Sequence, residues 1–243
     1  MTPADLARIT RRNIRTVQEA EALIDRLFRS YSAILSIDPD DIRDDDEFLR
    51  RLRVEVENPI MSIPGLERVI EKAAGIISQY PASMGEMRSL YHVILETGIR
   101  TYLSKANAEF LAEFRTFISR RVAEKTPYTE IMKELHHKYS ELPKYRVKRV
   151  VRTEMMRTNN LLNYYAGIKE FGHDAYYRVT THRDPCPICR ERYKFGEVIF
   201  PASDTANIPP LHPNCRCTIS WLPLSEIPGD LRRQSRQPIS RGG

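Results

Sequence analysis

The sequence predicts a mainly helical α+β protein, in which a long helical N-terminal portion precedes a small C-terminal module of short β-strands. Up to about Gly172, apolar residues recur at three- and four-residue spacing, the period of amphipathic helices. After Gly172, aromatic and β-branched residues become frequent, as they are in strands. We therefore expect three parts: a helical body at residues 1–142, a compact module at residues 143–222, and a tail at residues 223–243.

Composition limits the classes of protein to consider. The 243 residues are 41% hydrophobic and 29% charged, so the chain can bury a sizeable core and is not intrinsically disordered. Its formal net charge of +6 permits contact with nucleic acid or an acidic partner, although 38 basic residues against 32 acidic ones is a mild excess. The sequence shows no apolar signal core and no run of about 18 apolar residues, so we expect a reducing cytosol and no membrane partner.

The first long helix is predicted from Asp5 onward. Its apolar stripe consists of Leu6, Ile9, Ile14, Val17, Leu23, Ile24, Leu27 and Phe28. An acidic run at residues 38–47 then interrupts the pattern. Because this run lacks the central Gly and the terminal Glu of a calcium-binding loop, we interpret it as a solvated turn with acids near a helix N-terminus. Further breaks are expected at Pro59, Pro64 and Pro81.

Two more long helices follow. One is predicted over residues 87–122. Its inward-facing residues are expected to be Leu90, Val93, Ile94, Phe110, Phe114, Phe117 and Ile118. A new helix starts at Thr126-Pro127, since Thr can cap a helix and Pro is tolerated in a first turn. The last helix is predicted over residues 143–171, and Gly172 provides a left-handed cap.

A carboxylate lies on the apolar face of this last helix. The face consists of Val147, Val150, Val151, Leu161, Leu162, Tyr165 and Ile168, and the same stripe includes Glu154 and Thr158. A buried acid is either a structural strut or a catalytic group. Because no second carboxylate or nucleophile occurs at a fixed spacing nearby, we interpret Glu154 as a structural buried acid, with Arg178 or Arg216 as partner.

Three short strands are predicted in the C-terminal module, at residues 175–181, 197–200 and 216–222. A module of this size buries few apolar side chains by itself. A metal cross-link between its two halves would therefore supply stability that its core cannot.

The four cysteines cluster in two short turns. Cys186 and Cys189 form a C-x2-C pair, and His212 and Cys215 form an H-x2-C pair, with Cys217 two residues further on. Two turns that each offer two soft or borderline ligands are typical of a tetrahedral structural zinc site. We predict the members of the two pairs as zinc ligands and keep Cys217 as the reserve thiolate, because C-x-C is less often bidentate.

Other interpretations of the cysteines have specific weaknesses. Reduced cysteines can be small buried hydrophobes, and disulfides need an oxidising compartment. A catalytic zinc needs a position open to water, which four protein ligands do not leave. A redox C-x-x-C pair would normally open a helix after a strand, and Pro187 and the nearby Cys215 argue against it.

Basic residues lie between the cysteine pairs and in the tail. The segment between the pairs contains five residues suited to nucleic acid: Arg190, Arg192, Tyr193, Lys194 and Phe195. They could bind phosphate and stack on bases, but we favour the solvated face of a short helix or hairpin. The tail, which includes Arg232 and Arg233, has no apolar periodicity and is predicted to be a flexible basic extension.

A longer set of motifs extends from Val147 to Pro223. Its members are Arg152-Thr153-Glu154, Gly172, Asp184-Pro185-Cys186-Pro187-Ile188-Cys189, Gly196, Phe200 and Pro209-Pro210-Leu211-His212-Pro213-Asn214-Cys215-Arg216-Cys217. In order and spacing this set resembles the Mu F-like phage head morphogenesis family, also called minor head or minor capsid proteins. An acid-glycine pair often found after C-x-x-C in such proteins is replaced here by Phe195-Gly196. The residues before about 140 match the family by no motif.

The resemblance implies a minor head protein of a phage or prophage, acting in procapsid assembly, portal association and DNA packaging or delivery. It implies a portal, capsid or scaffold protein as partner, with packaged DNA as a non-specific one. The expected location is the host cytoplasm during assembly and then the virion. Because the resemblance assigns no reaction and the residues form no catalytic constellation, we expect that the protein is not an enzyme.

An enzyme is the competing hypothesis. His212-Pro213-Asn214 is similar to part of the motif of zinc-stabilised His-Asn-His nucleases, in which His212 or His182 would be the base. The sequence lacks a paired Asp-His or His-His strand motif ahead of a helix, which weakens this hypothesis. A DNA-binding zinc module without a head function is a third alternative.

Overall fold

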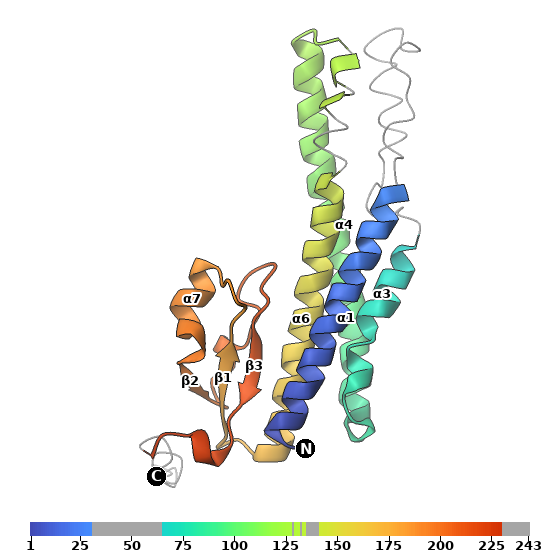
Figure 1. Ribbon diagram of the computed structural model, residues 1–243. Helices are drawn as coiled ribbons and strands as arrows, with labels where there is room; N and C mark the ends of the chain where they lie inside the picture. Colours follow the sequence, from blue (N-terminus) through green and yellow to red (C-terminus); the bar gives the residue numbers. More distant parts are fainter. Residues whose placement is uncertain (31–64, 128, 132, 135–140, 230–243) are drawn as a thin grey trace, which may run out of the picture. The chain divides into compact units, whose positions relative to one another are not determined.

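The computed structural model describes residues 1–30, 65–127, 129–131, 133–134 and 141–229 (Figure 1). Its helices with assigned bounds are α1 (Pro3–Ser30), α3 (Leu66–Ala74), α4 (Gly85–Ala123), α6 (Glu141–Phe171) and α7 (Pro187–Tyr193). Its strands are β1 (Tyr176–Thr180), β2 (Ile199–Pro201) and β3 (Thr218–Trp221). Short 3-10 helices are η2 (Ile77–Gln79), η3 (Ala82–Met84), η4 (Lys194–Gly196), η5 (Thr205–Asn207) and η6 (Leu224–Glu226). The predicted class, mainly helical α+β with a small antiparallel sheet, is confirmed.

The ends of the long helices follow from local chemistry. At the start of α1 the Thr2 hydroxyl accepts a hydrogen bond from the Asp5 N–H at 3.1 Å, and the Asp5 carboxylate accepts one from the Thr2 N–H at 2.9 Å. This reciprocal pair is a capping box, and the backbone hydrogen bond from Thr2 lowers the pKa of Asp5. At the far end of α6, Gly172 has a φ of 82°, the left-handed cap expected there.

The inward face of α4 was predicted correctly for its second half only. Leu90, Val93 and Ile94 are 52%, 62% and 41% exposed, so their predicted burial was wrong. The buried face of the first half of α4 consists of Tyr91, Leu95, Ile99 and Leu103. At about 100° per residue, Ile94 and Phe110 point about 160° apart, whereas Ile99 and Phe110 differ by about 20°. A single straight helix cannot bury both Ile94 and Phe110 on one face.

Packing divides the described chain into two compact units. Unit 1 contains residues 1–15, 76–91 and 155–243, and unit 2 contains residues 16–75 and 92–154. The helices α1, α4 and α6 each contribute one segment to each unit. Neither unit begins or ends at residue 142, and the boundary placed there for the C-terminal module stays a prediction.

Unit 2 has a helical apolar core. Its buried residues include Val17, Ala20 and Ile24 of α1, Val69, Ile70 and Ala73 of α3, Leu95, Ile99, Leu103, Phe110, Phe114, Phe117 and Ile118 of α4, and Val147 and Val151 of α6. Their three- and four-residue spacing is the period that places side chains on one helix face. Apolar packing among helices is therefore the main source of cohesion in this unit.

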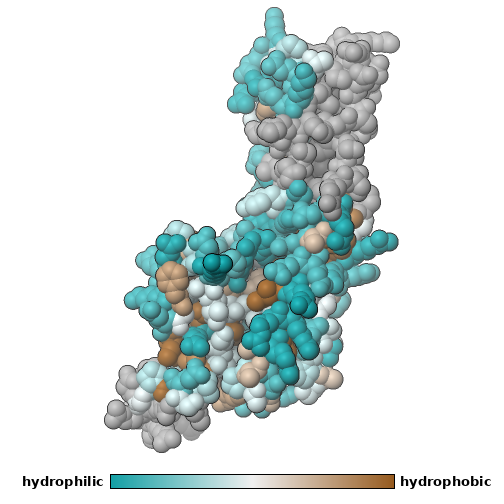
Figure 2. Space-filling model, viewed as in Figure 1, coloured by the Kyte–Doolittle hydropathy of each residue, from teal (hydrophilic) through white to brown (hydrophobic). Residues whose placement is uncertain are grey.

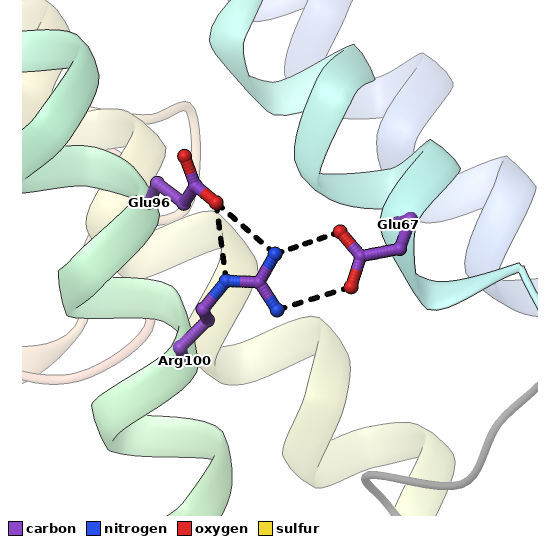
Figure 3. Close-up of polar contacts among 3 residues, drawn as sticks. All are labelled: Glu67, Glu96 and Arg100. Atoms are coloured by element: carbon purple, nitrogen blue, oxygen red, sulfur yellow. Dashed lines mark hydrogen bonds and ion pairs between the residues drawn. The ribbon is translucent and has the colours of Figure 1, made fainter.

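Charged side chains link the helices of unit 2 around this core. Arg100 of α4 donates two hydrogen bonds to Glu67 of α3, at 3.0 and 2.7 Å, and its guanidinium also binds Glu96 one turn earlier (Figure 3). These three side chains are at least 40% exposed. By contrast, the side chain of Arg146 in α6 is only 9% exposed, and it lies 2.6 Å from a carboxylate oxygen of Glu113.

The Arg152-Thr153-Glu154 tripeptide joins α6 to two other helices of unit 2. Arg152 forms an ion pair with Glu21 of α1. Glu154 is 5% exposed, and its Oε2 would lie 2.9 Å from a Cβ built on Gly98 of α4. A glycine at this position of α4 therefore leaves room for the buried carboxylate.

The two cations expected to pair with Glu154 have exposed side chains. Arg178 is 48% exposed and lies 3.7 Å from Glu226, and the Arg216 side chain is exposed. The pairing of either arginine with Glu154 stays a prediction. Both arginines belong to a small solvated module in which their side chains reach water.

The strands form a three-stranded antiparallel sheet in the order β2-β1-β3. Tyr177 of the central strand pairs with Phe200 of β2 and with Trp221 of β3. The centroid of the Tyr177 ring lies 5.5 Å from that of Phe200 and 6.0 Å from that of Trp221. The ring of Tyr193 in α7 packs on Phe200, with a centroid distance of 6.2 Å. The three strands predicted from composition are confirmed, and their core is a small aromatic cluster.

The Trp221 ring joins this sheet to α6 within unit 1. Its Nε1 donates a hydrogen bond to the carbonyl of Asn163 at 3.1 Å. A Cβ built on Gly167 would lie 1.9 Å from Cε2 of the indole, which is a severe overlap. The absence of a side chain at Gly167 is therefore what lets the tryptophan pack on the helix.

The segment after the sheet is partly packed. The Leu222 N–H donates to the Tyr176 carbonyl at 3.1 Å, and Ile227, which is 3% exposed, joins Tyr176 and Leu222 in a small apolar cluster. The first residues of the predicted tail therefore pack against the sheet, while the flexibility of the tail stays a prediction.

Several expectations lie outside the described residues: the acidic run at residues 38–47, the breaks at Pro59 and Pro64, and the tail arginines Arg232 and Arg233. Within the described ranges, no helix has both the length and the apolar character needed to span a membrane. The described surface on the face drawn in Figure 2 is mostly hydrophilic, with smaller hydrophobic patches between.

Candidate metal centre

The first pair of candidate ligands lies at the start of α7. Cys186 is the extended N-cap residue, Pro187 opens the helix, and Cys189 lies in its first turn. The Arg190 N–H donates to the Cys186 carbonyl at 2.9 Å, which closes the turn. The C-x2-C pair thus opens a helix after a strand, with Pro187 at the first helical position, and the exclusion of a redox role stays a prediction. A first helical residue needs no N–H donor, so proline fits there.

The second pair lies in the turn that leads into β3. The Cys215 N–H donates to the carbonyl of His212 at 3.3 Å, and Asn214 between them has a φ of 70°. Asparagine tolerates this left-handed conformation better than most residues. The turn carries His212 and Cys215, and Cys217 follows directly before β3.

The structure gathers all five candidate ligands. Nε2 of His212 lies 3.1 Å from Sγ of Cys186 and 3.2 Å from Sγ of Cys189, and the sulfurs of Cys189 and Cys215 are 3.7 Å apart. Two overlapping groups result, one of Cys186, Cys189 and His212 and the other of Cys189, Cys215 and Cys217, each with all ligand atoms within 4.8 Å. Cys189 is common to both.

The His212 ring is oriented for a metal ligand. Its Nδ1 lies 2.8 Å from the backbone carbonyl oxygen of Pro213. A carbonyl can only accept, so this contact assigns the hydrogen to Nδ1, and in that tautomer Nε2 has its lone pair free. That lone pair faces the sulfurs of Cys186 and Cys189. A histidine fixed through its other nitrogen is the usual arrangement at a metal site.

The buried thiols differ in acidity. A hydrogen bond from the Cys217 side chain lowers the pKa of Cys215 to about 5. The same bond raises the pKa of Cys217, which keeps its proton. Burial raises the pKa of Cys189 to about 12. At neutral pH the cluster therefore holds a thiolate at Cys215, and a bound cation would displace the proton of Cys189.

The donor set suits a borderline-soft ion. Sulfur and imidazole ligands favour zinc and related transition metals over calcium or magnesium, which prefer oxygen. Tetrahedral sulfur ligands at about 2.3 Å from an ion lie about 3.8 Å apart, close to the 3.7 Å between Cys189 and Cys215. The residues present therefore fit a metal ion, whose identity the donor set alone leaves open.

The comparison with known families concerns the segment that contains this cluster. The model of the Phage Mu protein F like protein family matches residues 112–220. This segment of the chain is similar to that family. The family is one of phage head morphogenesis proteins, which act together with other components of the head. The match begins 31 residues before the predicted module start (143 − 112). Neither a curated protein nor a solved structure gives a significant match.

The basic residues between the cysteine pairs of the Mu F-like segment differ in their availability. Arg192 binds the side-chain oxygen of Asn207, and Tyr193 is fully buried, so this tyrosine cannot stack on a base. Arg190 and Lys194 have exposed side chains, and Phe195 is 62% exposed. Nucleic-acid contact by this segment stays a prediction.

The two histidines of the nuclease hypothesis have other contacts in the Mu F-like segment. Nε2 of His212 faces the sulfurs, as described above. His182 is exposed, and its Nδ1 accepts a hydrogen bond from the Asp184 N–H at 3.3 Å. Neither contact places a carboxylate or a second histidine against a ring nitrogen.

Sequence reasoning missed a set of buried polar residues next to the cluster. Asn159, Asn160 and Asn163 of α6 are 0%, 0% and 1% exposed, and each makes hydrogen bonds to another segment of unit 1. A signal was present, because asparagine is a poor helix former and three of them fall within five residues of a long helix. Their partners depend on the tertiary structure and could not be predicted.

Proposed function

We propose that the protein is a phage or prophage minor head protein that acts in procapsid assembly, portal association and DNA packaging or delivery. The family match over residues 112–220 carries this proposal. The partners are a portal, capsid or scaffold protein, and the protein is in the host cytoplasm during assembly and then in the virion.

The metal centre of this protein is proposed to hold a structural zinc ion through Cys186, Cys189, His212 and Cys215. The orientation of the His212 ring and the 3.7 Å separation of two sulfurs support this assignment. When bound, zinc would cross-link the start of α7 to the turn before β3 as a closed tetrahedral site. The sheet behind these turns is small, so such a cross-link supplies much of its stability.

The protein is proposed to act without catalysing a reaction. Four protein ligands leave no position for a water molecule on zinc. The nearest alternative base, His212, has one nitrogen bonded to a carbonyl and the other directed at thiols. A nicking assay on supercoiled DNA with divalent metal tests this point. Cleavage that disappears in His212→Ala would contradict it.

Phage particles provide the test of the head function. A phage that lacks the gene is complemented with the wild-type protein or with Cys189→Ser, and its heads are examined by electron microscopy and infectivity. We expect defective assembly, packaging or delivery without the protein, and portal protein in its affinity-purified complexes. Normal, infectious heads in its absence would sink the proposal.

Non-specific contact with packaged DNA is a second proposal, favoured by the exposed side chains of Arg190 and Lys194. Binding to random duplex DNA should weaken as salt rises, since phosphate contacts release counterions. Charge reversal of both residues should weaken it further. Binding unaffected by the reversal would remove this segment from consideration.

A further inference from the structure

A ladder of buried asparagines on α6 lies between the second ligand turn and the N-terminal segment of α1. We define it as Asn159, Asn160 and Asn163. Burying an amide is costly unless its hydrogen bonds are replaced, so the partners of these side chains are specific determinants of the fold. All segments involved belong to unit 1.

Asn160 holds the backbone on both sides of the second ligand turn. Its side-chain NH2 group donates to the carbonyls of Pro209 and Cys217, at 3.1 and 3.0 Å. Its side-chain oxygen accepts the N–H of Ile219 at 3.2 Å. Pro209 precedes His212 by three residues, and Cys217 is itself a candidate ligand. One side chain thus fixes the approach and the exit of the segment that carries three candidate ligands.

The other two asparagines connect α6 to α1. Asn163 donates to the hydroxyl of Thr10 at 2.8 Å and to the carbonyl of Ile219 at 3.3 Å. The Asn159 side-chain oxygen accepts a hydrogen bond from Asn13 at 2.8 Å. Ile219 is the shared element, because its N–H binds Asn160 and its carbonyl binds Asn163.

The hydrogen bonds of the asparagine ladder are less complete where it contacts α1. Among the described residues, Oδ1 of Asn13, Nδ2 of Asn159 and Oδ1 of Asn163 are buried without a hydrogen-bond partner. A partly satisfied polar network contributes less to stability than a complete one. Local opening of the start of α1 is therefore expected to be easier than opening of the contacts that Asn160 makes.

We propose that the asparagine ladder presets the metal-binding turn and couples metal occupancy to the stability of the N-terminal segment of α1. The proposal rests on the proposed metal centre. Asn160 is a positioning residue: it orders the backbone around the ligands before the ion arrives, so less entropy is lost on binding. A bound ion in turn restrains residues 209–219, and Ile219 passes this restraint through Asn163 and Thr10 to α1.

Metal affinity of the full chain tests the positioning role. Zn²⁺ affinity is measured by competition with a chromophoric chelator, and Co²⁺ absorption reports tetrahedral thiolate coordination. Asn160→Leu keeps the approximate shape and removes the three hydrogen bonds, while Asn160→Asp keeps the acceptor and removes the two donated bonds. We expect an affinity about 10- to 100-fold lower in both, as for loss of other outer-sphere contacts.

Two controls make the affinity result decisive. Circular dichroism of the metal-free variants checks folding, and Asn160→Asp decides if Asn160→Leu does not fold. Wild-type affinity in a folded Asn160 variant would overturn the positioning role while leaving the metal centre intact. A wild-type protein that binds neither ion would instead refute the proposed metal centre, and the coupling with it.

Hydrogen exchange tests the coupling to α1. In the wild type, Zn²⁺ should slow amide exchange in residues 3–15. The double variant Thr10→Val, Asn13→Leu leaves the metal turn untouched, so it should bind Zn²⁺ with wild-type affinity but lose this metal-dependent protection. Equal exchange of residues 3–15 with and without Zn²⁺ in the wild type would overturn the coupling.

Discussion

The two compact units of this protein are stabilised in different ways. In its described residues, unit 2 buries apolar faces of α1, α3, α4 and α6, and several of its charged pairs lie at the surface. The sheet region of unit 1 has three short strands and one aromatic cluster, and it adds a thiol-imidazole cluster and buried amides. A segment too small for a large core needs cross-links and specific polar contacts, whereas long helices do not.

The largest difference in response between the units should follow from replacing Cys189, the candidate ligand common to both donor groups. Cys189→Ser should lower Zn²⁺ affinity by more than the roughly 100-fold typical of an outer-sphere change, and it should lower the Tm of unit 1. Hydrogen exchange by mass spectrometry should show faster exchange in residues 175–222 and little change in residues 92–123. Cys217→Ser is the matched control with a smaller expected effect. An equal loss in both variants would contradict the ligand assignment.

The next largest effect should come from the contact between Trp221 and α6. Gly167→Ala places a Cβ where the indole lies, and overpacking of this kind costs roughly 1–3 kcal/mol. Chemical denaturation, followed by tryptophan fluorescence, measures the loss. Gly85→Ala at the start of α4 is the control, since a Cβ there meets nothing within 4 Å. Wild-type stability in Gly167→Ala would show that Trp221 packs elsewhere.

A pH dependence should distinguish the metal-dependent unit from the helical one. Burial raises the pKa of Cys189 to about 12, so this thiol is protonated at neutral pH and must lose its proton to an ion. The pKa of Cys215 is lowered to about 5, so above about pH 6 it contributes no proton. Zn²⁺ affinity should therefore rise about tenfold per pH unit for each proton released between pH 6 and 8.

Calorimetry in buffers of different ionisation enthalpy gives the number of protons released on Zn²⁺ binding. A pH-independent affinity would show that Cys189 is not a ligand. The buried core of unit 2 is mainly apolar among its described residues and contains none of the thiols, so its exchange protection should change less over the same range.

The smallest effect is expected for the exposed ion pairs of unit 2. Arg100→Gln removes the contacts with Glu67 and Glu96 drawn in Figure 3. Exposed ion pairs are screened by salt and hold flexible side chains in place. The loss of stability should therefore be smaller than in Cys189→Ser or Gly167→Ala, and it should vanish at high salt. Arg146→Met is the contrasting variant, since that arginine is buried. A larger loss in Arg100→Gln than in Arg146→Met would reverse this ranking.

The helices were predictable because their determinants are local. Periodicity located α1, α4 and α6, and Gly172 marked the end of α6. The inward face of α4 could not be predicted in full. Its apolar residues change face along the helix, and the neighbouring helices select which of them are buried. Glu154 shows the same limit: its place on an apolar stripe was visible, but its contact with Gly98 depends on how α4 and α6 pack.

The helical periods, the strand positions and the two ligand turns are encoded locally, because each depends on residues within a few positions of one another. Long-range packing is needed to bring Cys189 into both donor groups, to place Trp221 over Gly167 and to bind the ligand turn to Asn160. These contacts join residues 23 to 57 positions apart. Such pairings are selected by packing and by the cost of unsatisfied buried groups, which no local pattern encodes.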